Sequence, residues 1–545
     1  MTVMRKLART LTPAPYVALA ATLVTAPLHA QRGPDWMTVG ADAQRSNWMR
    51  TDGKITPENM AKGGFAQVWT LKPENKTRQL NALMPPSMIE FYIGYRGFRS
   101  LGFFAGSDNR AVGVDIDLGA IEWEKGMAPI GVGGGSGTLT CPGGVTTSLT
   151  RPLNTAYPPL PLGRGGMGRG TPAKSAVSEP HQGSIPLQAY EARMAAAAAR
   201  PAAPPTPPPT PAAKPSMTGP GDSPFAPRVQ YAVGISGDGH LHMYWISNGN
   251  EPTASIPFLP ATANARGLVV YGDTAYVSTL AGCPGVPSGV WALDLASKKV
   301  TSWKASAKGV AGAMGQAAGP DGTVYVSDRS GELVALDPKT LKVLRTFKTG
   351  GAEITSSPVI FDHKGTNYAA ITTADGKLHV VNATDFTKAA STAEAFGAAN
   401  FQGAGLASWQ DWDGNRWILA SGGGSGANKN GAVTAFKFTG TSLEKGWASR
   451  DLVAPRAPVV VNGVAFLLSS GEFTTSDAKM SAADRASKSL PAVLYAYDAM
   501  TGKELWNSGS NMKSFATSGM SAGGSRIYVP AYDGTMHVFG FPMEH

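Results

Sequence analysis

The stretch VLYAYDAMTGKELW, residues 493–506, contains two short extended segments separated by a turn. Alternating side chains in the first segment predict a strand with one face packed against a neighbour. Asp498 ends this strand, where its carboxylate can accept hydrogen bonds from amides of the turn. Gly502 supplies a position that tolerates a positive φ angle. The second strand ends at Trp506, whose wide, flat side chain can dock on a neighbouring sheet.

The same pattern recurs along the chain. The steps from Asp294 to Asp337 and from Asp337 to Asn382 are 43 and 45 residues. A β-rich repeat of about 40–50 residues is typical of a propeller, in which each blade is a four-stranded sheet. Unrelated hairpins in a sandwich would not explain this spacing. The residues that carry the repeat are Trp69, Asp115, Trp123, Asp294, Trp303, Asp337, Asp498, Gly502 and Trp506.

The sequence therefore predicts an all-β, eight-bladed propeller over residues 31–545. The segment 65–72, with Trp69 at the tryptophan position, is a spare outer strand. We expect it to pair with 535–541 and close the ring, because closure removes exposed sheet edges. The blades are expected at 80–124, 140–258, 262–306, 311–349, 353–391, 402–449, 454–508 and 513–542.

The N-terminus has the features of a signal peptide covering residues 1–30. Arg5, Lys6 and Arg9 precede an apolar run at 16–25, and LHA at 28–30 suits a cleavage site. The alternative is an N-terminal membrane anchor, but the apolar run is short for a membrane span. We expect export to the periplasm or the extracellular space, with no transmembrane segment after cleavage.

Two insertions interrupt the repeat. Residues 151–227, in blade two, hold 18 of the 41 prolines. Such a composition predicts an extended or disordered segment, serving either as a docking arm or as a tolerated surface loop. A shorter insertion, 471–491, falls in blade seven.

Charge and cysteine content limit the possible roles. The leader and the proline-rich insertion supply most of the net charge of +10. The remaining chain is only mildly basic, which argues against a nucleic-acid partner. Cys141 and Cys283 lie in similar contexts, TCPGG and GCPGV. In an exported protein they could form a disulfide, or each could be a separate thiol, and the sequence leaves both open.

These features resemble the repeat family of proteins that bind pyrroloquinoline quinone (PQQ), which includes the quinoprotein alcohol dehydrogenases. YAYDAMTGKELW at 495–506 matches the blade signature of that family. The N-terminal segment also matches its leader strand, through Trp36, Gly40, Asp42, Arg45, Ser46, Ile55, Asn59 and Trp69. The resemblance spans nearly all of 35–542 apart from the insertions.

The resemblance implies PQQ and calcium in a central channel. It also implies Glu, Asn and Asp ligands, a catalytic Asp, a tryptophan below the quinone and a lid of two adjacent cysteines. This chain departs from that pattern: its two cysteines are far apart, it has no CxxCH haem motif, and no motif matches the ligand set. PQQ and calcium are thus possible but have no recognisable site, and no catalytic residue carries over.

Two other groups of residues could carry chemistry. His242, His379 and His537 occupy one repeat position, which Val334 fills in another blade, so a structural role is favoured over a metal site. His240 shares a strand face with His242. Asp411 and Asp413, in QDWDGNRW, could bind calcium or act as acid and base, but Asp-Gly is typical of a hairpin turn. The glycine-rich segments 131–137 and 421–426 open no helix, which favours loops over phosphate sites.

The favoured hypothesis is an exported, monomeric, non-catalytic propeller that binds an unidentified protein, polymer or small ligand. One alternative is a divergent dehydrogenase that depends on PQQ and calcium. A second is a scaffold for assembly of the cell envelope. Propellers host many functions, so the side chains around the axis must distinguish these hypotheses.

Overall fold

The structure is a computed structural model. It describes residues 35–79, 82–94, 97–129, 137–153, 231–396, 405–423, 430–475, 477 and 479–542. The chain divides into two units, 1–32 and 33–545, and only the second contains described residues. The expected signal peptide and most of the proline-rich insertion therefore lie outside the described residues.

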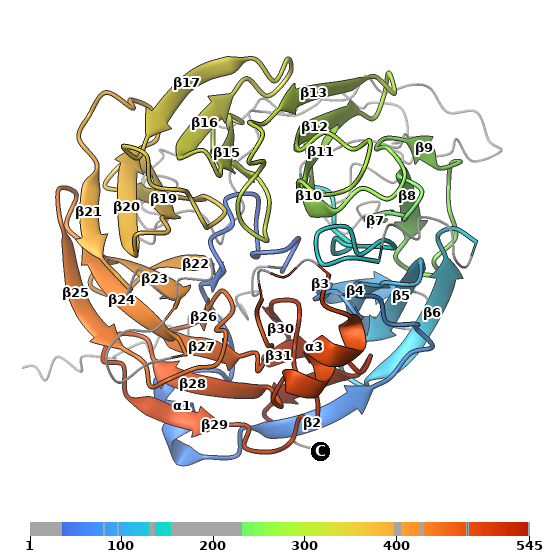
Figure 1. Ribbon diagram of the computed structural model, residues 1–545. Coiled ribbons are helices and arrows are strands. Elements are labelled where there is room, and N and C mark those ends of the chain that lie inside the picture. Colours follow the sequence, from blue (N-terminus) through green and yellow to red (C-terminus); the bar gives the residue numbers. More distant parts are fainter. Residues whose placement is uncertain are drawn as a thin grey trace, which may run out of the picture. The chain divides into compact units, whose positions relative to one another are not determined.

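The second unit is an eight-bladed β-propeller, as predicted (Figure 1). Blade one contains β3 (Ser87–Gly94), β4 (Gly97–Gly106), β5 (Arg110–Asp115) and β6 (Ala120–Gly126). The described strands of blade two are β7 (Tyr231–Ile235), β8 (His240–Trp245) and β9 (Ile256–Pro257), with a bridge from Thr150 to Val233 on the inner side. Blade three contains β10 (Ala265–Tyr271), β11 (Thr274–Thr279), β12 (Gly289–Asp294) and β13 (Val300–Lys304).

The next three blades repeat this order. Blade four contains β14 (Ala317–Ala318), β15 (Val324–Asp328), β16 (Glu332–Leu336) and β17 (Val343–Lys348). Blade five contains β18 (Val359–His363), β19 (Thr366–Thr372), β20 (Lys377–Asn382) and β21 (Ser391–Glu394). Blade six contains β22 (Leu406–Gln410), β23 (Arg416–Gly422), β24 (Ala432–Phe438) and β25 (Leu443–Ala448).

The last two blades incorporate strands from the N-terminus. Blade seven contains β26 (Val459–Val461), β27 (Val464–Ser469), β28 (Val493–Asp498) and β29 (Glu504–Asn507), and β1 (Trp48–Met49) pairs in parallel with β26. Blade eight contains β30 (Ser521–Gly523), β31 (Arg526–Pro530), β32 (Met536–Gly540) and β2 (Ala66–Leu71). The helices among the described residues are α1 (Pro57–Lys62) and, between β27 and β28, α3 (Ala482–Lys488). None of the described helices is long and apolar enough to span a membrane.

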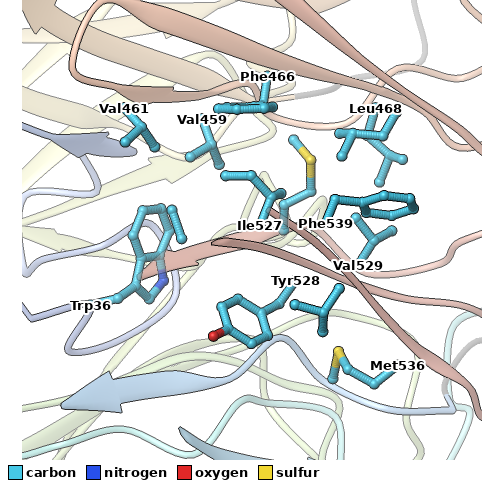
Figure 2. Close-up of a cluster of buried hydrophobic side chains, with 14 of the residues drawn as sticks. Trp36, Val459, Val461, Phe466, Leu468, Ile527, Tyr528, Val529, Met536 and Phe539 are labelled. Atoms are coloured by element: carbon cyan, nitrogen blue, oxygen red, sulfur yellow. The ribbon is translucent and has the colours of Figure 1, made fainter. Parts of the chain in front are cut away.

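Ring closure follows the prediction. β2 pairs antiparallel with β32, with Ala66 opposite Gly540 and Leu71 opposite Met536. A large buried cluster spans this closure (Figure 2). In it, Phe466 of blade seven and Phe539 of blade eight share one core with Trp36. Burial of this apolar surface stabilises the joint between the first and last parts of the chain.

The turns between the two outer strands behave alike. Asp498 accepts hydrogen bonds from the amides of Met500 at 3.0 Å and Thr501 at 2.8 Å. Asp337 and Asp115 accept bonds from the amides two and three residues further on in the same way. Each carboxylate thus accepts hydrogen bonds from turn amides that have no backbone carbonyl as a partner.

The turn glycines also form joints between neighbouring blades. Gly502 has a φ angle of 73°, and an added Cβ would lie 2.5 Å from Trp447 of blade six. The Trp447 indole donates to the Ala499 carbonyl at 2.9 Å, in the turn that holds Gly502. Trp69 with Gly119, and Trp123 with Gly249, repeat this arrangement.

The irregular segment from Trp36 to Asp52, here called the hub segment, occupies the centre of the ring (Figure 1). It contacts the eight blades in chain order. The carbonyls of Trp36, Met37, Ala43, Gln44, Ser46 and Asn47 accept bonds from blades one, two, four, five, six and seven. Thr38 donates to Leu268 of blade three, and Asp52 accepts from Ser525 of blade eight.

Candidate functional site: the axial well

A cavity, here called the axial well, lies where the inner ends of the blades meet the hub segment. Its volume is about 840 Å³, including space open to solvent. The hub segment contributes Val39, Gly40 and Asn47 to the lining. Every blade contributes at least one residue, among them Met84, Thr146, Gly267, Met314, Ser357, Gly405, Arg456 and Ser518.

Arg266 is one of two arginines in the wall of the axial well. It stands at a register shift in β10, between the pairs that the strand makes with β11. One guanidinium nitrogen donates to the Thr146 carbonyl at 3.1 Å, while its Nε has no hydrogen-bond partner. Among the described residues, no carboxylate lies within ion-pair distance of it. Burial lowers the pKa of Arg266 to about 10, so the side chain is still charged at neutral pH.

Arg456 is the second arginine. It forms an ion pair with Glu472, and it also donates to the Ala516 carbonyl at 3.3 Å. Its Nε has no hydrogen-bond partner. Burial lowers the pKa of Arg456 to about 10, and the positive charges of Arg485 and Arg266 contribute to the lowering. The two arginines of the well therefore repel one another.

Glu472 and Arg485 support Arg456 from the blade-seven insertion. Glu472 is 8% exposed and pairs with both arginines, through different carboxylate oxygens. Arg485, on α3, is 1% exposed and donates to the Gln79 carbonyl. Its guanidinium lies 5.4 Å from the rings of Phe515 and Tyr532. These contacts fix Glu472, and Glu472 in turn holds Arg456 against the well.

Hydroxyl groups make up much of the remaining polar wall. Thr146 donates to the Ala265 carbonyl at 3.0 Å, and Ser518 donates to the Leu83 carbonyl at 3.1 Å. Ser357 accepts from the Met314 amide at 3.0 Å. These bonds tie neighbouring inner segments together, so the wall is organised before a ligand arrives.

The lining does not fit the calcium and PQQ site that the family resemblance implies. In the described part of the chain, the axial well has neither a carboxylate nor a histidine in its lining. Tryptophan is also absent from that described lining. Nor do the described residues contain a group of three or more side chains able to hold a metal. Calcium prefers several oxygen ligands, usually including carboxylates, so these residues do not form its site.

The repeat histidines lie in separate blades and bond locally. His242 contacts Ser236 Oγ through Nε2 at 3.0 Å and Glu251 through Nδ1 at 3.1 Å. This order resembles a Ser-His-Glu triad, but Ser236 is only 2% exposed. In blade five, His379 contacts Thr373 and Thr392 in the same way, each at 3.1 Å. The arrangement therefore locks a hairpin, and the histidines do not converge on a metal.

The aspartates in QDWDGNRW also serve a turn. Asp411 accepts bonds from the amides of Asp413 at 3.0 Å and Asn415 at 2.8 Å, and from the Trp417 indole at 2.8 Å. Its oxygens are thus occupied inside the hairpin. Residues 131–136 and 424–426 of the two glycine-rich segments lie outside the described residues, whereas 421–422 form the end of β23.

Cys141 and Cys283 form a disulfide, which decides between the two possibilities that the sequence left open. Cys141 lies a few residues before Thr146, and Cys283 lies between β11 and β12 of blade three. The disulfide therefore fastens one wall of the well to the neighbouring blade. Glu472 and Arg485 belong to no shared motif, so the repeat pattern does not indicate them. Arg266 and Arg456 stand at equivalent positions of blades three and seven, five residues before the end of β10 and of β26, and this agreement is a signal that could have found them.

Comparison with known proteins identifies the fold. No protein-family profile and no curated protein sequence matches the chain. Quinohemoprotein alcohol dehydrogenase from Comamonas testosteroni matches with a TM-score of 0.56 and 13% identity, over 94% of this chain and 81% of the other. A europium-containing methanol dehydrogenase matches with a TM-score of 0.55 and 11% identity, over 93% and 98%. BamB from Moraxella catarrhalis matches with a TM-score of 0.47 and 14% identity, over 88% of this chain and 100% of the other. The chain thus has the eight-bladed fold of the quinoprotein dehydrogenases.

Proposed function

We propose that the protein is an exported binding protein that holds a small ligand in the axial well without transforming it. The observation that carries this proposal is the well itself, to which all eight blades and the hub segment contribute. Concave sites with a few convergent polar groups are typical of small-molecule binding.

The chemistry of the lining favours binding over catalysis. Acid–base catalysis works best with a group that exchanges a proton near the operating pH. Arg266 and Arg456 have pKa values of about 10, so they stay protonated at neutral pH. The other polar groups in the described lining are hydroxyls, an amide and backbone groups. These groups can orient a ligand, but they do not supply a base.

Export is supported by two features. The first 30 residues have the composition of a signal peptide. The Cys141–Cys283 disulfide is typical of proteins in oxidising compartments. Both features favour a periplasmic or extracellular site of action.

Gly519 offers a way to test binding in the well. It lines the cavity, and an added Cβ would have no neighbour within 4 Å. Gly519→Trp should therefore fill the well with little disturbance of the wall. A thermal-shift screen of sugars, alcohols, amino acids and carboxylic acids should find a compound that stabilises the natural protein but not this variant. At about 100 times Kd, a ligand adds about 2.7 kcal/mol to stability.

Gly126→Trp is the matched control. Gly126 is exposed at the end of β6, outside the well, and also has open space around an added Cβ. The compound should stabilise Gly126→Trp as much as it stabilises the natural protein. A compound that stabilises Gly519→Trp as strongly as the natural protein would place binding elsewhere and contradict the proposal.

The dehydrogenase alternative requires a separate assay. The purified protein should not oxidise alcohols in a dye-linked assay supplied with PQQ and Ca²⁺, because the described lining supplies no carboxylate, either as a base or as a calcium ligand. Activity that requires both additions and is absent from a boiled sample would overturn the non-catalytic proposal.

A further inference from the structure

We infer that the axial well selects a small dianion, which Arg266 and Arg456 hold between them. The inference rests on the proposed binding function and names the class of ligand. The shared chemistry is that of a dicarboxylate or a phosphate ester.

The first support is the count of charges around the well. Arg266, Arg456 and Arg485 are positive, and Glu472 is the carboxylate that pairs with the latter two. Two positive charges therefore remain uncompensated by this group. Burying an unpaired charge is costly, and a ligand of opposite charge removes much of that cost.

The second support is the donor geometry of the two arginines. The Nε groups of Arg266 and Arg456 are enclosed by protein and have no partner, so contact with a ligand in the well falls to the terminal nitrogens of each guanidinium. A guanidinium presents its donors in a planar fork that matches the oxygens of a carboxylate or a phosphate. Thr517 and Ser148 add hydroxyl groups to the same lining. Because no carboxylate lies in the described lining, nothing there repels an anion.

The third support is the way in which Arg456 is held. Glu472 neutralises one charge but leaves the Nε of Arg456 unpartnered. Arg485 fixes the opposite side of Glu472 from α3. The blade-seven insertion therefore supplies two positioning residues, Glu472 and Arg485, for the second arginine of the well.

Isothermal titration at neutral pH tests this inference directly. The probes are succinate, methyl phosphate, acetate and the neutral analogue succinamide. A dianion should bind at least about tenfold more tightly than acetate, since hydrogen bonds to charged groups are among the stronger ones. Succinamide should give no measurable binding. Succinate and methyl phosphate distinguish a carboxylate ligand from a phosphate ligand.

Two variants test the arginines. Arg266→Gln and Arg456→Gln should each weaken binding of the preferred dianion by about tenfold or more. Arg266→Gln should also raise the melting temperature of the ligand-free protein, because it removes a repelling buried charge. If Arg266 only stabilised the fold, its replacement would lower the melting temperature. Arg329→Gln, at an exposed ion pair outside the well, is the control and should bind normally.

A measurement on the natural protein complements the variants. Binding of the dianion should weaken as sodium chloride is added, because chloride competes and salt screens the charges. Arg266→Lys should retain part of the affinity, since it keeps the charge but loses the planar fork.

Several results would overturn the inference. These are no binding of either dianion at millimolar concentration, equal affinity for succinamide, or unchanged affinity in both glutamine variants. If neutral compounds bind in the well and anions do not, with Gly519→Trp blocking them, the proposed function stands and this inference fails. If Gly519→Trp affects no ligand, both fail.

Discussion

Position 531 lacks the hydroxyl group that its equivalents in two other blades carry. Ser236 in blade two and Thr373 in blade five contact both a histidine and an aspartate of their own hairpin. Ala531 occupies this position in blade eight, and both ring nitrogens of His537 lack a partner there. The backbone is otherwise equivalent, because all three residues donate their amides to the carbonyl four residues on.

Ala531→Ser should therefore stabilise the protein. The new hydroxyl can bond to His537 and Asp533, as Ser236 does to its own partners, and one such bond contributes about 0.5–1.5 kcal/mol. Denaturant unfolding should show the gain as a higher midpoint at the same slope. Ser236→Ala, the reverse change in blade two, should cost a similar amount. An unchanged midpoint in both variants would show that the hydroxyl contributes nothing.

His537 should also make stability depend on pH. Burial lowers the pKa of His537 in the folded protein below its usual value. The unfolded chain therefore takes up a proton at a higher pH than the folded protein, so stability falls as the pH drops through about 6.5. His537→Val, which copies Val334 of blade four, should remove this part of the acid sensitivity in melts between neutral and mildly acidic pH.

His379→Val is the comparison for this experiment. It would leave the hydroxyls of Thr373 and Thr392 without their histidine, so it should destabilise the protein at neutral pH as well. If His537→Val melts with the same pH dependence as the natural protein, another group causes the sensitivity.

At the scale of elements, the blade signature has a physical meaning that the sequence indicates only in part. The alternation, the turn aspartate and the terminal tryptophan predict strands and packing between blades. The structure adds that the glycine of one blade and the tryptophan of the preceding blade form a single joint. In one copy of the signature, the glycine therefore belongs to the joint with the preceding blade and the tryptophan to the joint with the following blade. A single copy of the repeat does not reveal either joint.

Gly502→Ala should cost more stability than a glycine substitution at an open turn. Any side chain at a positive φ costs about 1–2 kcal/mol, and here the Cβ would also meet Trp447 at 2.5 Å. Gly350→Ala is the matched control, with a φ angle of 79° and no atom within 4 Å of its Cβ. The difference between the two unfolding free energies measures the joint. Equal losses of unfolding free energy would mean that the Trp447 side chain moves aside at no energetic cost.

At the scale of the whole molecule, periodic features were predictable and the others were not. The eight blades and the pairing of 65–72 with 535–541 follow from repeated residues at regular spacing. The hub segment bonds to six blades through backbone carbonyls, which any side chain can accompany, although the buried Arg45 also donates to the carbonyls of Gly267 and Gln316. Arg266 and Arg456 occupy equivalent positions in blades three and seven, but the repeat does not indicate that both face one cavity. Their meeting depends on ring closure, which brings distant positions together.

Deleting residues 31–72 should prevent folding of the propeller. The deletion removes β2, which pairs with β32, and the hub segment, which bonds to all eight blades. Unpaired strand edges then favour aggregation. Size-exclusion chromatography and thermal melting should show aggregates without a cooperative transition. Removing residues 2–30 alone is the control and should leave a cooperative melt. A soluble deletion protein with a cooperative melt would contradict the role of closure.

The Cys141–Cys283 disulfide also determines the outcome of cleaving the backbone between the two cysteines. The two cysteines are 142 residues apart in sequence, and the proline-rich insertion falls between them. Any single backbone cut from residue 142 to residue 282 therefore leaves two polypeptides that are still covalently joined. Such a nicked protein would migrate as one species on a denaturing gel without reductant and as two with it. Its ring would still be tied across the break, so the protein can lose the continuity of its backbone without separating into fragments.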